Sequence, residues 1–262
     1  MKISIITVCL NPGESLNFTM DSIIKQQYTD YEVLIKDGGS TDNSLENIPA
    51  DSRFRLISGK DKGIYDAMNI ALGQITGDTV IFMNCGDSFY DDSVLERIAL
   101  AESEQKLKAQ FIIYGDIFSK LAGTVVKSPS RITPKVCYNQ IPCHQATVYS
   151  ADLFQERAFD TAYRIRADYE HFLYCYFEKH TDFVYMDYPV CVYEGGGFSE
   201  SRKNRKSARK EHSLIVKKYI PFNVRFSQKL RLIITLQPLR EKMAKSKAFG
   251  TVYEKIRRMI KK

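Results

Sequence analysis

Apolar runs of strand length alternate with helix-like segments through the first hundred residues, and this alternation constrains the fold more than any other feature. Four runs have the nearly uniform apolar composition of buried strands, over residues 3–8, 31–35, 54–57 and 79–83. Between them, two segments carry apolar side chains at helical spacing, residues 15–27 and 65–72. Strands separated by helices predict an α/β fold with a mostly parallel, Rossmann-like sheet flanked by helices.

The second half of the chain is less regular. It predicts a strand, an aromatic-rich helix and then one or two further strands, over residues 111–114, 168–178 and 181–193. From residue 201 onward the sequence is basic with helical patterning, interrupted by Pro221 and Pro238. We therefore predict a main domain over residues 1–200 and a basic, amphipathic C-terminal tail over residues 201–262.

Polar residues follow the predicted strands at three places, residues 7–11, 37–40 and 84–87. Ligands of open α/β sheets bind at the carboxyl ends of the strands. We therefore expect polar side chains such as Thr7 and Asn11 to border a ligand site at this edge.

The first motif at this edge is D-G-G-S-T-D, which begins at Asp37. A carboxylate there can accept hydrogen bonds from a nucleoside, and the glycines let the backbone approach a ligand closely. The sequence leaves open a plain glycine-rich turn in which Asp42 caps the following short helix.

The second motif is D-K-G-I-Y-D-A-M-N at residues 61–69. Lys62 precedes a predicted helix whose N-terminus favours a phosphate. Asp66 and Asn69 are three residues apart and share a helix face, as Tyr65 and Asn69 do at a spacing of four. A solvated cap followed by an amphipathic helix is the alternative.

The third motif, M-N-C-G-D at residues 83–87, ends a strongly apolar strand. Asp87 can there hold a divalent cation that bridges a diphosphate. A Gly-Asp turn without a ligand is the alternative.

Together the three motifs resemble glycosyltransferase family 2, inverting enzymes with the GT-A fold. The opening I-I-T-V-C-L-N resembles the family's first strand and turn, and Asp37 matches the first acid of its nucleobase-binding D-D/G-G-S-T-D element. Residues 61–69 resemble a segment of a bacterial polysaccharide subgroup, and the pieces follow in order over residues 1–95. The resemblance implies a nucleotide-sugar donor bound by Thr7, Asn11, Asp37, Lys62, Asp66, Asn69, Asn84, Arg202 and Arg205.

The resemblance also implies Mg²⁺ or Mn²⁺, but the metal-binding D-x-D element is altered. Asn84 and Gly86 stand where its acids would be, and Asp87 follows. One carboxylate attracts a hard cation less than two do, so Asp87 would share the ion with phosphates and water. Metal-independent transfer stays an alternative.

Two motifs in the second half match the same family. C-H-Q at residues 143–145 resembles a subgroup motif near the acceptor, so His144 is expected to orient substrate or touch the metal, with a buried structural histidine as the alternative. R-A-D-Y-E at residues 166–170 resembles the motif that carries the general base, although Ala167 replaces its glutamate. Asp168 is therefore the expected base, and a helix N-cap is its alternative role.

The segment G-G-G-F-S at residues 195–199 and the basic residues after it resemble a loop that closes over the donor. Arg202 and Arg205 would then neutralise the departing diphosphate, unless they belong to a solvated helical face. We expect Asp37, Asp87 and Asp168 to gather around one diphosphate-bearing ligand.

The resemblance implies transfer of a sugar to a hydroxyl of a lipid-linked or growing saccharide in bacterial surface polysaccharide synthesis. A nucleotidyltransferase acting on a sugar phosphate is the competing enzyme hypothesis, although Asn11-Pro12-Gly13 is too sparse for its phosphate loop. A dinucleotide oxidoreductase would need G-x-G-x-x-G at that position, which the chain lacks.

Charge is distributed very unevenly along the chain. Residues 201–262 contain 20 Lys and Arg against 3 Asp and Glu, a charge of +17, whereas the other 200 residues contain 18 against 28, a charge of −10. We expect the tail to bind an anionic membrane surface, because Phe and Ile stripes flanked by cations suit lipid headgroups. Its packing on the acidic body is the alternative. A nucleic-acid-binding protein is the hypothesis from another class, and we expect no such partner, since the body offers no basic, aromatic-interleaved platform.

The remaining features indicate the compartment. Six cysteines without a C-x₂-C pair argue against a zinc site and a disulfide scaffold. No apolar stretch reaches the ~20 residues of a membrane span, and the N-terminus lacks the pattern of a secretory signal. We expect a cytoplasmic protein whose tail meets the inner face of the plasma membrane.

Overall fold

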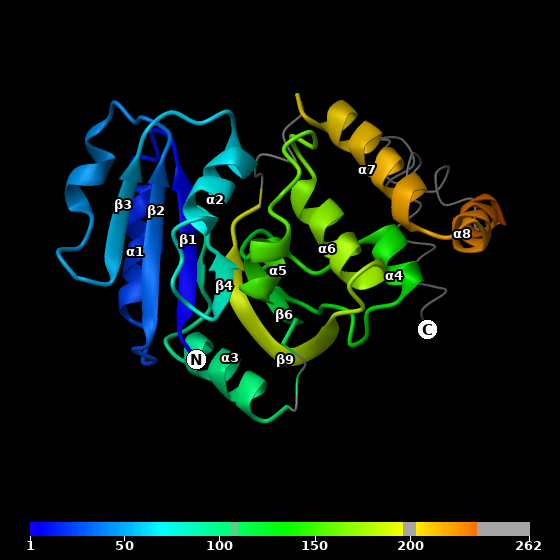
Figure 1. Cartoon of the computed structure of the whole chain (residues 1–262), viewed down its shortest axis with the longest axis horizontal. Helices are drawn as coiled ribbons and strands as arrows, with labels where there is room; N and C mark the ends of the chain where they lie inside the picture. The colour runs from blue at the N-terminus through cyan, green and yellow to red at the C-terminus, as the bar shows by residue number, and fades with distance from the viewer. Residues whose placement is uncertain (106, 108, 196–202, 235–262) are drawn as a thin grey trace. The chain divides into compact units, whose positions relative to one another are not determined.

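The computed structural model describes residues 1–105, 107, 109–195 and 203–234. The chain divides into two compact units, Met1–Tyr219 and Ile220–Lys262. The described part of the first unit contains a nine-stranded sheet with helices on both faces (Figure 1). The predicted α/β fold class is confirmed.

The first half of the sheet is parallel, as the alternating pattern predicts. Its strands are β1 (Ile3–Cys9), β2 (Tyr31–Asp37), β3 (Phe54–Ser58) and β4 (Thr79–Phe82), in the order β3-β2-β1-β4. The connecting helices are α1 (Ser15–Ile24), the 3₁₀ helix η1 (Asn43–Asn47) and α2 (Ile64–Leu72). In Figure 1, α1 and α2 lie on opposite faces of these strands, so β1 and β2 are buried on both sides and need nearly continuous apolar sequence.

The second half of the sheet is mixed. Its elements are β5 (Ser88–Phe89), α3 (Val94–Ser103), β6 (Phe111–Ser119), β7 (Thr124–Val126), α4 (Pro134–Asn139), the 3₁₀ helix η2 (His144–Ala146), β8 (Thr147–Ser150), α5 (Asp152–Glu156), α6 (Ala167–Phe177) and β9 (Asp182–Tyr193). Strand β8 runs antiparallel between β4 and β6, and β9 runs parallel to β6. The strict β-α-β alternation therefore ends at β4, which explains why the later sequence pattern is harder to interpret.

Helix α1 ends three residues earlier than the apolar spacing predicts. Just beyond its end, the side-chain amide of Gln26 donates to the Asp91 carbonyl at 2.7 Å and accepts from the Leu95 backbone amide at 3.0 Å. These bonds join the end of α1 to the start of α3. The two helices cover one face of the sheet and form the main apolar core with the inward side chains of the strands.

Helix α7 (Arg205–Tyr219) belongs to the first unit, although it lies in the predicted basic tail. The fully buried carboxylate of Glu170 on α6 accepts from Arg157, from Lys218 at 2.7 Å and from the Tyr219 hydroxyl at 2.6 Å. Burial alone would raise the pKa of Glu170, but these donors outweigh it and hold the pKa below its usual value. For α7, the structure therefore agrees with the alternative in which the basic segment packs on the rest of the domain.

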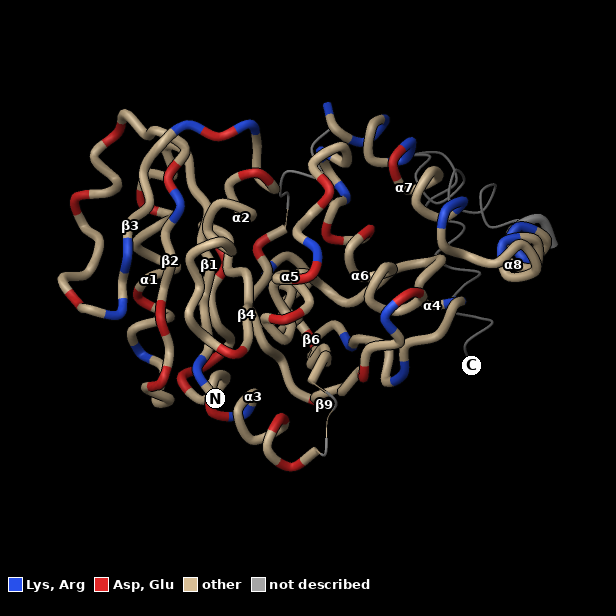
Figure 2. Tube along the Cα trace, in the orientation of Figure 1, with Lys and Arg blue, Asp and Glu red and all other residues tan. Residues whose placement is uncertain are grey.

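The described part of the second unit is helix α8 (Phe222–Ile234). Phe222, Phe226 and Leu230 follow one another at intervals of four residues, and their side chains are exposed. Arg225 and Lys229 interrupt this apolar stripe with positive charge (Figure 2). No described helix in either unit combines the length and the apolar character that a membrane crossing requires.

Candidate active site

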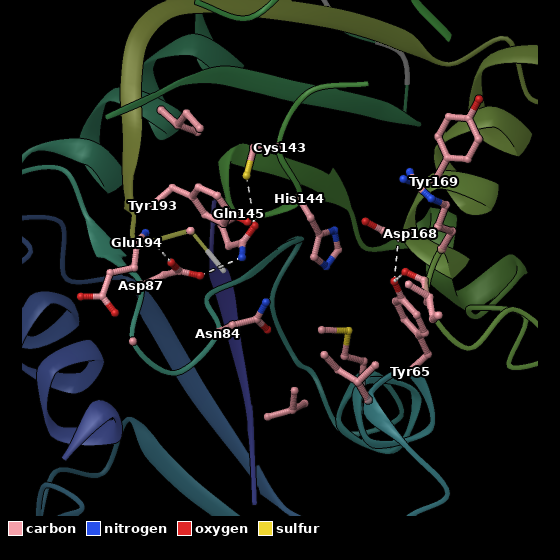
Figure 3. Close-up of a pocket in the computed structure, with 18 of the residues that line it drawn as sticks. Tyr65, Asn84, Asp87, Cys143, His144, Gln145, Asp168, Tyr169, Tyr193 and Glu194 are labelled. Atoms are coloured by element: carbon pink, nitrogen blue, oxygen red, sulfur yellow. Dashed lines mark hydrogen bonds between the residues drawn. The ribbon is translucent and has the colours of Figure 1, made fainter. Parts of the chain in front are cut away.

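A cavity of about 670 Å³ opens at the carboxyl ends of β1 and β4 (Figure 3). Five parts of the chain supply most of its wall: the loop after β1, the β4–β5 loop, the segment before β8, the start of α6 and the end of β9. The start of α2, Ile117 of β6 and His212 of α7 complete the described lining. This cavity lies at the edge of the sheet where the sequence predicts a ligand site.

Asp87 stands at one end of this cavity and is nearly buried. Its Oδ2 accepts from the Gln145 amide at 2.7 Å, and its Oδ1 accepts from the Glu194 backbone amide at 3.4 Å. Burial raises the pKa of Asp87, and the Gln145 bond offsets this only in part. The carboxylate is thus held in a site where positive charge would stabilise its ionised form.

Asn84 lies beside Asp87 in the cavity wall. Its Oδ1 is buried and has no hydrogen-bond partner among the described residues. A buried amide oxygen without a donor is costly unless a ligand supplies one. The β4–β5 loop can bring Asn84 and Asp87 to one side because Gly86 adopts φ +95°, a conformation that favours glycine.

Asp168 stands at the other end of the cavity, in the first turn of α6. The Tyr65 hydroxyl on α2 lies 2.7 Å from Asp168 Oδ1 and 3.0 Å from the Ile165 carbonyl oxygen, so it can donate to either. Burial, together with the negative charge of Asp168, raises the pKa of Tyr65 well above its usual value and keeps it a donor. Asp168 makes no capping bond, because residue 166 holds the N-cap position.

Instead, the backbone before α6 is held by Glu211 of α7. Its carboxylate accepts from the amides of Arg164 at 3.2 Å and of Ile165 and Arg166 at 3.0 Å each. Helix α7 therefore fixes the turn from which Asp168 enters the cavity.

His144 lies between the two carboxylates in Figure 3. Its ring stacks on Phe82 with centroids 4.7 Å apart, and neither ring nitrogen has a hydrogen-bond partner in the part of the chain that is described. Burial lowers the pKa of His144 and outweighs the opposite effect of Asp168. A neutral imidazole therefore lines the middle of the cavity.

Asp37 and Asn11 lie outside the lining and organise the two loops beside it. Asp37, 2% exposed, accepts from the Gly39 amide and from the amide and hydroxyl of Ser40. Asn11 Oδ1 accepts from the backbone amides of Thr41 and Asp42. The backbone amide of Asn11 donates to Ser40 Oγ at 2.8 Å. The sequence predicts that Asp37, Asp87 and Asp168 gather around one ligand. Of these three, only Asp87 and Asp168 line the cavity, and the loop of Asp37 is hydrogen-bonded to the Asn11 loop that borders it.

The other predicted donor-binding residues that the structure describes also lie outside the lining. Asp66 accepts from the Lys62 amide at 2.8 Å, and the exposed Lys62 side chain does not line the cavity. Asn69 uses both ends of its amide on the Phe159 backbone, at 2.9 and 3.0 Å, and therefore ties α2 to that segment. Thr7 is fully buried in β1. Arg205 begins α7 away from the lining, and Arg202 lies outside the described residues.

Residues 4–147 match the family model described as Glycosyl transferase family 2. The chain belongs to this family. It is a glycosyltransferase, and this assignment favours the glycosyltransferase hypothesis over the nucleotidyltransferase one.

Curated relatives extend the similarity over most of the glycosyltransferase. It is 29% identical over 240 residues to the "PGL/p-HBAD biosynthesis glycosyltransferase" of Mycobacterium bovis BCG, covering 89% of this chain and 88% of that one. The Mycobacterium tuberculosis H37Rv protein of that description gives the same values.

Solved structures show the same GT-A fold. TarS 1–349 of S. aureus superposes with a TM-score of 0.65 at 17% identity, covering 82% of this chain and 65% of that one. A mannosyltransferase from Pyrobaculum calidifontis, solved with GDP-Man and Mn²⁺, superposes with a TM-score of 0.65 at 16% identity, covering 96% and 83% of the two chains. At these identities the likeness establishes the fold alone.

Several lining residues of the glycosyltransferase escaped the sequence analysis. Tyr65 and Gln145 lie inside motifs that the sequence singles out, so their contacts with Asp168 and Asp87 could have been sought there. Glu194 and His212 carry no local motif. Glu211 does not line the cavity but was missed as well, and it had one available signal, since it is one of 3 acids among residues 201–262.

Proposed function

We propose that this protein is an inverting glycosyltransferase that moves a sugar from a nucleotide-sugar donor to a hydroxyl of a lipid-linked or growing saccharide. The observation that carries the proposal is one cavity with two carboxylates at opposite ends. Asp87 is nearly buried at one end, and Asp168 accepts a hydrogen bond from Tyr65 at the other. Such a transfer needs two anchored functions: stabilisation of a departing diphosphate and removal of a proton from the acceptor.

The donor diphosphate is assigned to the end that holds Asp87. Its nucleoside would lie along the loops of Asn11 and Asp37, which border that part of the cavity. The partnerless Asn84 Oδ1 and the Asp87 carboxylate are oxygen ligands of the kind that Mg²⁺ and Mn²⁺ prefer, so the residues present fit a divalent cation. A cation held there would neutralise charge on the diphosphate as it departs. Arg202 and Arg205 remain predicted phosphate contacts.

The acceptor is assigned to the end that holds Asp168. Its carboxylate would take the proton of the acceptor hydroxyl as the oxygen attacks the anomeric carbon from the face opposite the leaving group. The bond from Tyr65 orients one carboxylate oxygen, which leaves Oδ2 for the acceptor. The neutral His144 between the two ends offers an unpartnered ring nitrogen to a sugar hydroxyl.

The first experiment identifies the donor by thermal shift with UDP-, GDP- and dTDP-sugars, with and without Mn²⁺. Transfer is then measured for Asp168→Asn, which should lower the rate about 10²–10⁴-fold with the nucleotide affinity unchanged. Asp152→Asn removes an exposed carboxylate on α5 and serves as the matched control. Transfer by Asp168→Asn within a few-fold of wild type would remove Asp168 from the role of base.

A membrane-bound acceptor is supported by the surface of helix α8. This helix exposes Phe222 and Phe226 beside Arg225 and Lys229, a combination that suits an anionic lipid surface. We accordingly propose that residues 201–262, through α8, hold the enzyme at the inner face of the plasma membrane.

Flotation with anionic and neutral vesicles tests this surface. The double variant Phe222→Ser, Phe226→Ser should lose most binding to anionic vesicles, because it removes both aromatic side chains of the stripe and leaves its charge. Leu121→Ser, which removes an exposed leucine from the β6–β7 turn, is the control. Equal flotation of the double variant and the control would contradict the assignment to α8.

A further inference from the structure

Arg166 presents a positive charge to the cavity that the reaction described above does not use. It is the only Lys or Arg among the described residues that line the cavity. Its Nε is buried without a hydrogen-bond partner, and its side chain forms no ion pair within the described parts of the chain. The guanidinium lies over the Tyr169 ring, 5.9 Å from its centroid. A guanidinium stays ionised at all ordinary pH values, so a partly buried one without a counter-charge is costly.

Two carboxylates belong to its surroundings, Glu211 through the Arg166 backbone amide and Asp168 two residues along the chain, and neither forms an ion pair with its guanidinium. Glu211 places both oxygens on the backbone amides of residues 164–166. Asp168 directs Oδ1 to the Tyr65 hydroxyl. The main chain of Arg166 is therefore fixed by Glu211, while its guanidinium is left to face the cavity.

The surroundings of Arg166 belong to the acceptor end of the cavity. In Figure 3, Asp168 and Tyr169 lie at one side and Asp87 and Glu194 at the other. Tyr169 stacks on His212 with centroids 5.1 Å apart and planes at 14°, which gives this end a rigid aromatic wall. Burial, followed by the charge of Arg166, lowers the pKa of His212, so His212 adds no second cation.

We propose that Arg166 binds an oxyanion of the acceptor, a phosphate or a carboxylate, and so selects an acidic acceptor. The proposal rests on the assignment of Asp168 to the acceptor end. A guanidinium suits such a group because its planar fork can donate two parallel hydrogen bonds to one oxyanion. The donor diphosphate is the less fitting occupant, since its end of the cavity lies with Asp87 and Asn84.

The test measures binding of acidic sugars while the donor site is filled. Isothermal titration is done with glucose 6-phosphate, glucuronic acid and neutral glucose, in the presence of a saturating amount of whichever of UDP, GDP or dTDP stabilises the protein. The wild type should bind one or both acidic sugars and bind glucose far more weakly. Arg166→Gln should weaken the acidic sugar about 10–100-fold, the value of a charge-assisted hydrogen bond, and leave the nucleotide affinity unchanged.

Arg164→Gln is the matched control, because it removes an exposed arginine two residues away that does not line the cavity. It should bind the acidic sugar as the wild type does. If Arg166→Gln does not fold, Arg166→Lys replaces it, and retention of charge without the planar fork should weaken binding by a smaller factor.

Three results would overturn the proposal. They are equal binding of acidic sugars by the wild type and the Arg166 variant, no preference of the wild type for acidic over neutral sugar, and displacement of the acidic sugar by the nucleotide. The last would move Arg166 to the donor phosphates. Failure of the proposed function is seen separately, as loss of nucleotide-sugar binding or as undiminished transfer by Asp168→Asn.

Discussion

Glu211→Ala tests whether α7 positions the turn that carries Asp168, the proposed base. The variant removes the carboxylate that accepts from three backbone amides. One of them belongs to Arg164, an exposed residue, so water can replace that lost bond. The amides of Ile165 and Arg166 are less accessible, and each bond to a carboxylate contributes about 1.5–3 kcal/mol net. With partial compensation we expect a loss of about 3 kcal/mol, or a fall in Tm of roughly 6–12 °C for a unit of this size.

The effect on catalysis should exceed the effect on donor binding. A shift of ~1 Å in the turn that carries Asp168 can cost about 10²-fold in rate, so kcat should fall about 10–100-fold while the KM for the donor stays within a few-fold. In Glu211→Gln the side chain keeps one acceptor oxygen, which can take the place of the carboxylate oxygen that accepts from the amides of Ile165 and Arg166. This variant should therefore recover part of the lost kcat and stability.

Differential scanning calorimetry and steady-state kinetics measure both effects, with Glu104→Ala, an exposed glutamate at the end of α3, as the control. A fall in Tm without a change in kcat would mean that Glu211 stabilises the fold and does not position Asp168. An unchanged Tm and kcat would refute the reasoning altogether.

Three other variants probe particular groups. Glu170→Gln should destabilise the first unit by about 2–3 kcal/mol, a value kept low because Lys218 is 44% exposed. The pKa of Glu170 is lowered in the folded protein, so the wild type should lose this stability as the pH falls below about 4.5 and through the folded-state pKa. Urea titrations at several pH values should show this loss for the wild type and not for the variant. Asn84→Asp supplies a second carboxylate beside Asp87 and should lower the Mn²⁺ concentration for half-maximal transfer about tenfold, and an unchanged Mn²⁺ titration would argue against a cation there. Gly115→Ala would place Cβ 2.5 Å from the Tyr188 carbonyl oxygen at a register shift of β6 against β9, so thermal melts should show a loss of at least about 2 kcal/mol.

The first four strands could be predicted because the same local requirement, burial in a parallel sheet, shapes the sequence of each strand. Buried parallel strands require continuous apolar runs, and the polar residues that follow them mark a shared edge. That argument predicted Asp87 at this edge, and Asp87 lines the cavity there. It did not separate a residue that faces the cavity from one that builds the adjacent loop, which is where Asp37 and Asn11 lie. Both roles need a short polar side chain after a strand, so the pattern is the same for each.

The end of the cavity that holds Asp168 could not be predicted in the same way, because its geometry depends on pairs far apart in the chain. The bond from Tyr65 to Asp168 spans 103 residues, and those from Glu211 to the turn before α6 span 45 to 47. The charge count, which sums residues 201–262 as one block, placed the domain boundary ahead of α7. A sum over charges conceals a single acid, yet Glu211 is the residue that satisfies the backbone amides before α6. In a strongly basic segment, an isolated acid is therefore worth examining as a contact to the rest of the fold, because its own neighbours already supply more cations than it needs.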